Sequence, residues 1–371
     1  MFIVSPILRL IGRILSYILY GVTLLAAFGG KVDPQYMTLP AMLVLILPYL
    51  VIATLIVSIL WFLNRRIIPG ALGIVVLLAG WSSIGPAVPI SFPNKAPEGS
   101  KTFTLLTFNS LHLDDLKSPS GGADRAVRFL LNCGADIICL QELEDWNDCV
   151  EIQDLTPALR DSLFARYPFQ AGSKSSDLKV LSRYPVELQK VTSPGPFKRA
   201  HRYDYFRLRI DGRPLDLINM HISSYSLSDK ERQVLTDIHS PSSARHSVAE
   251  FKGSIFNKMR QSFRERARNV DELIAFASSL QGPLIVCGDF NDVPSSWAYR
   301  KMIDAGFQDA YSETSFGPTY TYNKHLFLFH IDQIFYRGAL VPLKVSRLGH
   351  DTSDHYPLIA EFALENTVPK R

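Results

Sequence analysis

Three long apolar stretches near the N-terminus constrain this chain more than any other feature. They cover residues 14–30, 40–63 and 67–89. A helix needs about 20 apolar residues to cross a bilayer, and the second stretch exceeds that length without a single charged side chain. The sequence therefore predicts a transmembrane region of three spans within residues 1–89.

Neither a signal peptide nor a buried core accounts for all three stretches. A cleaved signal peptide would produce the first stretch but not the two that follow. A buried core helix would produce any one of them, but three such helices in succession are not expected. A transporter-like membrane protein is disfavoured because the spans carry no charged side chain that would mark an ion or substrate pathway.

The charges around these stretches predict an orientation. Residues 1–100 hold six positive and two negative side chains, whereas the rest of the chain holds 33 of each, so the net charge of +4 belongs to the N-terminal part. Arg9 and Arg13 precede the first stretch, and Arg65 and Arg66 separate the second from the third. Because positive loops stay on the cytoplasmic side, we expect the larger C-terminal part to be extracytoplasmic. Its neutral charge argues against a dedicated nucleic-acid-binding protein.

The pattern of the chain changes after a linker at 90–101, which contains two prolines and a glycine. Short apolar runs of strand length follow, interleaved with helical periodicity, and they predict an α/β or α+β domain over 102–365 with a tail at 366–371. The expected strands are 102–109, 136–141, 178–183, 204–210, 214–221, 283–289, 331–336 and 356–363. The expected helices are 124–132, 255–280 and 296–305.

Polar side chains terminate one apolar strand after another. These residues are Asn109, Glu142, Asn219, His221, Asp289, Asn291, Asp332, Asp354 and His355. Each alone fits an ordinary structural role, such as an Asx turn at Asp289 and Asn291 or a hydrogen-bonded core histidine at His221. Six strand ends of this kind are harder to attribute to packing, because a buried carboxylate without a role is costly.

The residue types predict hydrolysis at phosphorus. Carboxylate and amide oxygens suit Mg²⁺ or Mn²⁺ better than zinc. A divalent cation neutralises phosphate oxygens and stabilises the leaving oxygen, and an Asp–His pair supplies a base for attack by water.

The same segments resemble the endonuclease/exonuclease/phosphatase superfamily, which includes deoxyribonuclease-type nucleases, inositol-polyphosphate phosphatases and neutral sphingomyelinases. The motifs that carry the resemblance occur in the family's order over about 101–365. They are Leu-Leu-Thr-Phe-Asn109, Leu-Gln-Glu142, Asn219-Met-His221, Gly-Asp289-Phe-Asn291, Ile-Asp332-Gln-Ile and Ser353-Asp354-His355. Gly-Asp-Phe-Asn and Ser-Asp-His together are the most specific of these motifs.

The resemblance implies a four-layer sandwich of two mostly antiparallel β-sheets flanked by helices, and it implies roles for the site residues. Glu142, Asn109 and Asp354 would be metal ligands or their immediate support. His355, oriented by Asp332, would be the general base, although Asp289 could take that role instead. His221, Asn291 and Asn219 would bind the substrate, with His221 also a candidate acid. Glu144 departs from the family, which often has a basic residue there.

The sequence leaves the substrate open among lipid head groups, nucleotides and nucleic acid, and between phosphodiesters and phosphomonoesters. Two basic segments, 197–209 and 245–268, are solvated faces or a phosphate-facing rim, and the polar insertion at 222–255 is a candidate substrate loop. No obligate protein partner is evident. The alternative to an enzyme is a membrane-tethered binding module that keeps the fold, and the intact set of polar residues argues against it.

Overall fold

The structure, a computed structural model, describes residues 6–113, 123–143, 155–190, 202–224, 245–324 and 328–365. Side chains are described from residue 253 onward in the helix that begins at Arg245. The predicted substrate loop at 222–255 falls largely outside this description, as do Glu144, the start of the basic segment at 197–209, and the tail.

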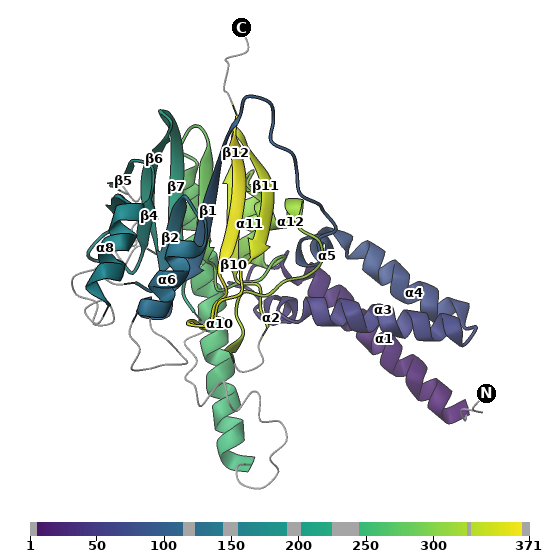
Figure 1. Cartoon of the computed structure of the whole chain (residues 1–371). Helices are drawn as coiled ribbons and strands as arrows, with labels where there is room; N and C mark the ends of the chain where they lie inside the picture. Colours follow the sequence, from purple (N-terminus) through teal and green to yellow (C-terminus); the bar gives the residue numbers. More distant parts are fainter. Residues whose placement is uncertain are drawn as a thin grey trace.

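Two six-stranded sheets form the centre of the domain (Figure 1). The first has the order β11-β12-β1-β2-β4-β3 and the second the order β5-β6-β7-β8-β10-β9. The first sheet is built from β1 (Lys101–Asn109), β2 (Ile137–Gln141), β3 (Phe169–Ala171), β4 (Lys179–Ser182), β11 (Leu340–Arg347) and β12 (Leu358–Leu364). The second is built from β5 (Val186–Gln189), β6 (Tyr203–Ile210), β7 (Arg213–His221), β8 (Leu284–Asp289), β9 (Gln308–Asp309) and β10 (Asp332–Arg337).

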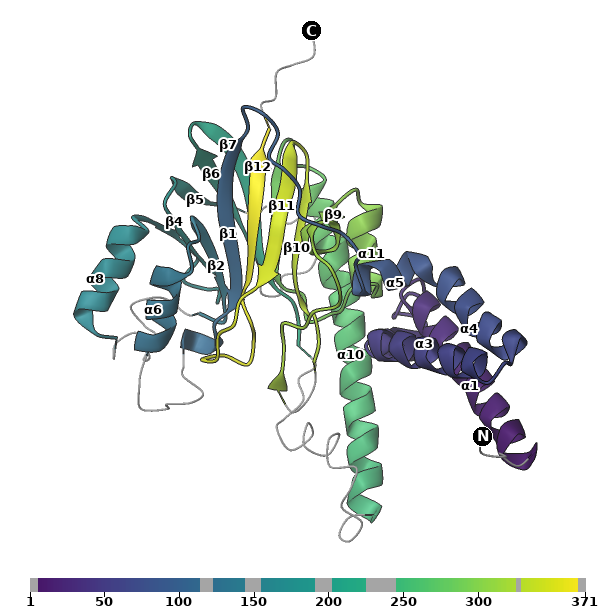
Figure 2. The ribbon, with the colours of Figure 1, turned by 45° about the vertical axis from the view of Figure 1, so that its right-hand side comes forward.

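The alternation of side chains along the central strands produces the layers. In β1, Phe103 and Leu105 enter the core between the two sheets, whereas Leu106 and Phe108 face the opposite way, as the two-residue period of a strand requires. The outer face of the first sheet is covered by α6 (Asp124–Asn132) and α8 (Pro157–Arg166). The outer face of the second is covered by α10 (Arg245–Ala277) and α11 (Trp297–Asp304), with α12 (Ala310–Thr314) beside β11 (Figure 2). The predicted four-layer sandwich is confirmed.

All eight predicted strands and all three predicted helices of this domain are present, with small shifts at their ends except that α10 begins ten residues before the predicted start at 255. The strands that the sequence did not indicate are β3, β5, β9 and β11. Three of them are short, and β11 is irregular because its register shifts between Pro342 and Lys344. The α8 and α12 helices and the 3₁₀ turn at Leu111–Leu113 were also not predicted.

The N-terminal region contains more and shorter helices than the three predicted spans. It consists of α1 (Pro6–Gly29), α2 (Leu39–Val44), α3 (Leu47–Leu63), α4 (Ile67–Ala79) and α5 (Trp81–Ala87). Among the described residues, α1 is the one helix that is long and apolar enough to cross a membrane by itself.

The two later stretches each depart from a single straight helix. The stretch at 40–63 splits into α2 and the 17-residue α3, because Pro48 in the first turn of α3 cannot continue the preceding helix. The stretch at 67–89 bends by 75° between α4 and α5. The expectation of three continuous spans is therefore corrected to one complete helix, one bent pair and one shorter apolar helix.

These helices pack together and dock on the domain. Figures 1 and 2 show α1, α3 and α4 side by side, with the start of α1 and the α3–α4 turn at the end farthest from the sheets. At the near end, Val44 and Leu45 pack against Phe263, Val293 and Ile331 of the domain. The predicted linker also lies against the domain, since the Ser91 N–H donates to the Ser315 carbonyl at 3.1 Å and the Asn94 N–H donates to the Leu343 carbonyl at 2.8 Å.

Candidate active site

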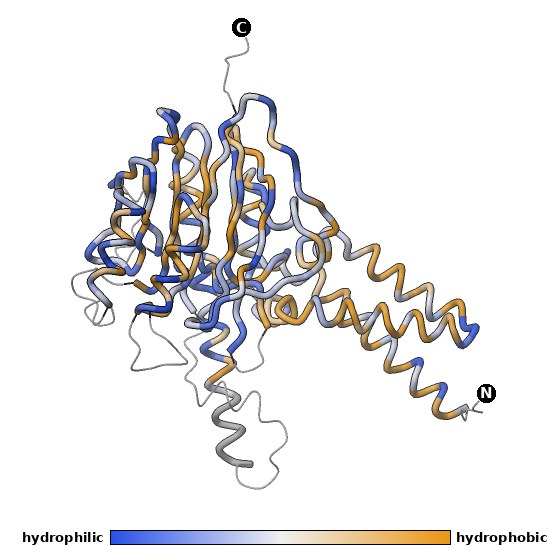
Figure 3. The backbone as a smooth tube through the Cα atoms, in the orientation of Figure 1, coloured by the Kyte–Doolittle hydropathy of each residue, from blue (hydrophilic) through white to orange (hydrophobic). Residues whose placement is uncertain are grey.

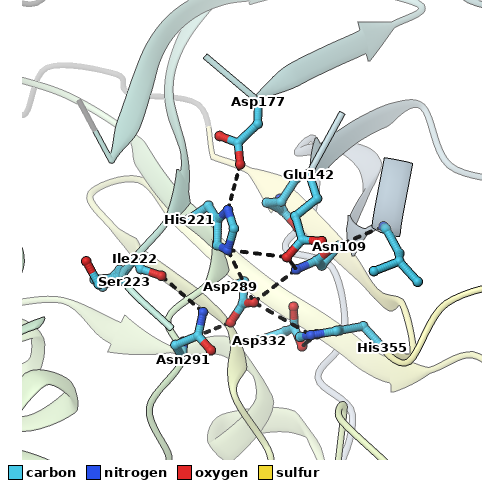
Figure 4. Close-up of polar contacts among 12 residues, drawn as sticks. Asn109, Glu142, Asp177, His221, Ile222, Ser223, Asp289, Asn291, Asp332 and His355 are labelled. Carbon is cyan, nitrogen blue, oxygen red and sulfur yellow. Dashed lines mark hydrogen bonds and ion pairs between the residues drawn. The ribbon is translucent and has the colours of Figure 1, made fainter. Parts of the chain in front are cut away.

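Strand register brings several of the predicted residues into one row. In the second sheet, Asp289 at the end of β8 lies opposite His221 at the end of β7 and opposite Asp332 at the start of β10. In the first sheet, Asn109 at the end of β1 lies beside Gln141, the residue before Glu142. Because the two sheets face each other, these ends meet at one edge of the sandwich (Figure 4).

Asp289 is the centre of this arrangement. Asn109 donates its side-chain N–H to Glu142 Oε1 at 3.0 Å and to Asp289 Oδ2 at 3.1 Å, which joins the two sheets. The same Asp289 oxygen lies 3.7 Å from His355 Nε2 and 3.9 Å from His221 Nε2. Its other oxygen accepts the Asn291 N–H at 2.8 Å. One buried carboxylate thus contacts four of the predicted residues.

Two histidines are each oriented by a carboxylate. His355 Nδ1 donates to Asp332 Oδ2 at 2.9 Å, and His221 Nδ1 donates to Asp177 Oδ2 at 2.8 Å. Each bond leaves the Nε2 atom of its ring directed at Asp289 (Figure 4). His221 Nε2 also lies 3.6 Å from Glu142 Oε1.

Asp177 is a site residue that the sequence did not reveal. It precedes β4, at the start of a stretch that resembles a strand of the family but gave Asp177 no role, and it is 44 positions from its partner His221. Burial would raise the pKa of Asp177, but the hydrogen bond and charge of His221 lower it. It therefore holds the ring of His221 as an ionised carboxylate.

Burial and charge set the proton affinities of the site. Burial raises the pKa of Asp289, and the negative charge of Asp332 adds to this effect, while His355 and His221 oppose it. Burial alone would lower the pKa of His355, but the charges of Asp332 and Asp289 and the hydrogen bond to Asp332 raise it to about 10. The pair is therefore arranged with the proton on the imidazole.

Backbone conformation at the site is unusual for the residues involved. Glu142 has a φ of 52° and Asn291 a φ of 46°, a left-handed region that side chains other than glycine occupy rarely. Asn291 is held there by its N–H bond to Asp289 and by its side chain, which donates to the Ile222 carbonyl at 3.0 Å. Such local strain often accompanies functional sites.

Two predicted residues are placed differently from the rest. Asn219 is fully buried beneath the site, where its amide oxygen accepts from Gln141 at 2.6 Å and its nitrogen donates to the Leu140 and Lys179 carbonyls. It links the two sheets rather than facing a substrate. The Asp354 carboxylate lies 4.0 Å from Lys324 Nζ, and Ser353 anchors its segment by donating to the Asn109 carbonyl at 2.9 Å.

The cluster has the residue types to hold a cation. Ligand atoms of Asp289, Asp332 and His355 lie within 4.8 Å of one another, but Asp332 and His355 are already bonded to each other. Glu142, Asp289 and Asn109 offer a second set with oxygen ligands, which Mg²⁺ prefers. The buried Asp332 Oδ1 has no hydrogen-bond partner among the described residues. An excess of carboxylates over histidines favours a bound cation in either position.

Comparisons with known proteins agree with the geometry. The profile of the endonuclease/exonuclease/phosphatase family matches residues 106–355, and a profile described as a domain of unknown function matches residues 8–86. No curated protein sequence matches the chain.

Several solved structures are similar to the chain at low identity. Humanised TDP2 from D. rerio has 16% identity and a TM-score of 0.45, covering 70% of this chain and 98% of its own. Sphingomyelinase C from Streptomyces griseocarneus has 17% identity and a TM-score of 0.42, and the match covers 70% of this chain and 99% of the sphingomyelinase. The human nocturnin catalytic domain has 15% identity and a TM-score of 0.45, and the match covers 73% of this chain and 100% of the nocturnin domain.

The family profile covers most of the chain and includes every strand-end residue of the cluster. The chain therefore belongs to the endonuclease/exonuclease/phosphatase family and is a hydrolase of phosphoester bonds.

Proposed function

We propose that residues 102–365 hydrolyse a phosphoester with the help of Mg²⁺ or Mn²⁺, and that residues 1–89 anchor this domain to a membrane. The observation that carries the proposal is the contact of Asp289 with Asn109, His221, Asn291 and His355. These residues come from both sheets, and packing alone does not require polar groups of this kind to meet.

Glu142 would hold the cation, together with the Asn109 amide, whose oxygen and nitrogen can exchange places so that the oxygen faces the ion. A bound cation would neutralise the phosphate and stabilise the leaving oxygen. Asp354 would contribute negative charge nearby, since it also raises the pKa of His355.

The proton affinities support a division of roles. Asp289, whose pKa is raised, would accept a proton from the attacking water. His355 would stay protonated and donate from Nε2 to a phosphate oxygen, with Asp332 holding its ring. Of the two candidate bases that the sequence leaves open, His355 and Asp289, the proposal therefore takes Asp289.

His221 would donate to the phosphate or to the leaving oxygen. Burial lowers its pKa, but the bond to Asp177 and the charge of Asp289 outweigh burial and raise it. Asn291 would bind the phosphate through the second N–H of its amide, because the first already bonds the Ile222 carbonyl. Asn219 would act as a positioning residue that fixes the distance between the sheets.

The N-terminal helices support membrane anchoring because most of their residues are hydrophobic, as Figure 3 shows, and because large apolar side chains cover much of their outer surface. Some of the contacts between them are polar: the Thr23 and Thr54 hydroxyls lie 2.8 Å apart, and Trp61 Nε1 donates to Ser16 Oγ at 2.9 Å. Such contacts are typical of helices that associate in lipid.

The outward-facing side chains of these helices are mostly large and apolar. They include Ile11, Ile14, Leu15, Ile18, Ile56, Ile59, Leu63, Val75 and Leu78. The arginines of α1 and of the α3–α4 turn belong to the end farthest from the domain, which supports an extracytoplasmic site.

The test is hydrolysis by the full-length protein in detergent. Bis-p-nitrophenyl phosphate and p-nitrophenyl phosphate should separate diesterase from monoesterase activity. We expect turnover with Mg²⁺ or Mn²⁺, complete loss with EDTA, and a loss of about 10²–10⁴-fold in Asp289→Asn. Asp136→Asn is the matched control, because this carboxylate pairs with Arg183 away from the site. Turnover that persists in EDTA would contradict metal dependence, and none on any phosphoester would favour the binding-module alternative.

A further inference from the structure

An apolar cavity lies where the N-terminal helices meet the catalytic domain. Its volume is about 280 Å³, close to the lower end of small-molecule pockets, which begin at about 300 Å³. One wall comes from the helices and includes Leu45, Tyr49 and Ile52, and the other comes from the domain and includes Val293, Phe329 and His330. Within the described part of the chain, no Lys, Arg, Asp or Glu side chain lines it.

The domain wall of the cavity comes from segments that also carry residues of the active site. Val293 follows the loop that begins with Asp289 and Asn291, and His330 is two residues before Asp332. Phe329 pairs through its backbone with Tyr322, whose ring packs against His355 with centroids 5.2 Å apart. A molecule in the cavity therefore lies against the segments that hold the catalytic carboxylates.

The helix wall of the cavity continues onto the apolar outer surface of α3. Tyr49 and Ile52 line the cavity and are about half exposed, with relative exposures of 47% and 50%. Ile56, Ile59 and Leu63 continue the same face at steps of three and four residues, and all are exposed. In a membrane this face contacts lipid, so an acyl chain can pass from the bilayer into the cavity without crossing water.

One of the residues that line the cavity, His330, has a buried ring nitrogen that packing does not satisfy. His330 is 6% exposed, and its Nε2 atom has no hydrogen-bond partner among the described residues. Unsatisfied buried nitrogens are uncommon.

We propose that this cavity takes up one acyl chain of a membrane phospholipid whose phosphate lies in the active site. The substrate class would then be lipid phosphoesters rather than nucleic acid, because a strand of nucleic acid has no apolar chain to fill the cavity. The assignment of a substrate rests on the proposed hydrolysis, but binding of the chain does not.

Binding is tested with the full-length protein in phosphatidylcholine vesicles that contain phosphatidylcholine with a diazirine in one acyl chain. After illumination, mass spectrometry should find label on Val293, Tyr320 or Phe329, which belong to the domain wall. The Ile52→Trp variant should reduce that label about tenfold, because the larger ring occupies the space of the chain. Ile59→Trp, two turns farther along the same face, should leave it unchanged. Label confined to the outer faces of α1 and α3 in the wild type would overturn the proposal.

Hydrolysis supplies the second measurement. The ratio of kcat/KM for a long-chain lipid to that for its short-chain analogue should fall about tenfold in Ile52→Trp and stay unchanged in Ile59→Trp. An unchanged ratio in Ile52→Trp would also overturn the proposal. If domain-wall label is found but no phosphoester is turned over, the proposed hydrolysis fails while the acyl-chain site stands.

Discussion

At the level of single residues, Asp332 is held by a backbone hydrogen bond and in turn orients the catalytic His355. Its N–H donates to Thr321 Oγ1 at 3.0 Å, and its carboxylate accepts from His355 at 2.9 Å. The sequence predicted both Asp332 and His355 because each lies at the edge of an apolar strand. It could not predict Asp177, because that residue reaches His221 from a loop, and no local pattern records a contact across 44 positions.

Replacing Asp332 by Asn should lower kcat at least about 10²-fold and move the alkaline limb of the pH–rate profile. The proposed active form of His355 is protonated, so activity is lost as pH rises through its pKa of about 10. Without the negative charge of Asp332 that pKa falls, and the limb should shift to lower pH. The measurement is kcat as a function of pH.

Thr321→Val provides the control for this change. It removes the hydroxyl that accepts the Asp332 N–H but leaves the carboxylate charge in place, so the limb should stay near its wild-type position. An alkaline limb that does not move in Asp332→Asn would exclude His355 as the titrating group.

At the level of secondary-structure elements, the close approach of β7 and β8 positions the catalytic row. Gly288 has a φ of 137°, and a Cβ atom there would lie 2.0 Å from the Met220 carbonyl oxygen. The glycine before Asp289 is therefore required for the two parallel strands to pair, and with them for Asp289 to face His221.

Gly288→Ala should reduce the free energy of unfolding by about 3 kcal/mol or more, because overpacking and an unfavourable φ act together. Gly212→Ala is the matched control. Its φ is 83°, but no atom of the described residues lies within 4 Å of the new Cβ, so the cost should be about 1 kcal/mol. Thermal unfolding of both variants measures the difference. Equal losses of unfolding free energy in the two variants would show that the backbone shifts to relieve the contact between the new Cβ atom and Met220.

A second element-level effect concerns the cap of α12. Asp309 accepts the Tyr311 N–H at 2.9 Å and the Tyr299 hydroxyl at 3.0 Å. Burial raises the pKa of this carboxyl to about 6 from 3.8. The folded protein therefore holds its proton more tightly than the unfolded chain, and this contribution to stability is present below about pH 4 and lost as pH rises through 6.

Asp309→Asn should remove this dependence, since the amide stays neutral and its oxygen can still cap the helix. Relative to wild type, the variant should gain about 2 kcal/mol between pH 4 and pH 8. The melting temperatures of both proteins at the two pH values give the comparison, with the exposed Asp304→Asn as control. A constant difference between wild type and Asp309→Asn would mean that Asp309 titrates normally.

The sequence predicted elements well where their period was regular. The central strands are short apolar runs bounded by turn residues, and α10 repeats its apolar residues every three or four positions, so both were expected. The short edge strands β3, β5 and β9 offer too few residues for a period to emerge. The break at Pro48 and the bend between α4 and α5 were missed because apolar composition hides where a helix stops.

At the level of the whole molecule, the helices and the domain meet over an extensive contact. Arg264 of α10 donates to the Gln35 carbonyl at 3.0 Å, and the Tyr49 hydroxyl donates to the Leu328 carbonyl at 3.1 Å. Together with the pairing of the linker, these bonds fix the domain against one end of the bundle. Hydrophobicity alone predicted a membrane region but gave no sign of this contact, because its partners are far apart in the chain.

The orientation can be tested with single cysteines in a chain whose own four cysteines are replaced by Ala. A membrane-impermeant maleimide should label Tyr36→Cys, at the domain end of the bundle, in intact cells. It should label Asn64→Cys, at the opposite end, only after permeabilisation, because the positively charged end remains inside. The reverse pattern would place the catalytic domain in the cytoplasm.

The rigid attachment of the domain to its helices has a kinetic consequence. An enzyme on a flexible tether samples a volume, but one clamped to its anchor keeps its catalytic edge at a constant height over the bilayer. If the helices anchor the protein in a membrane and its substrate is a lipid, as proposed, its encounters with substrate would depend on lateral diffusion and on the mole fraction of substrate in the leaflet. Dilution with inert lipid should slow it even when the total amount of substrate is unchanged.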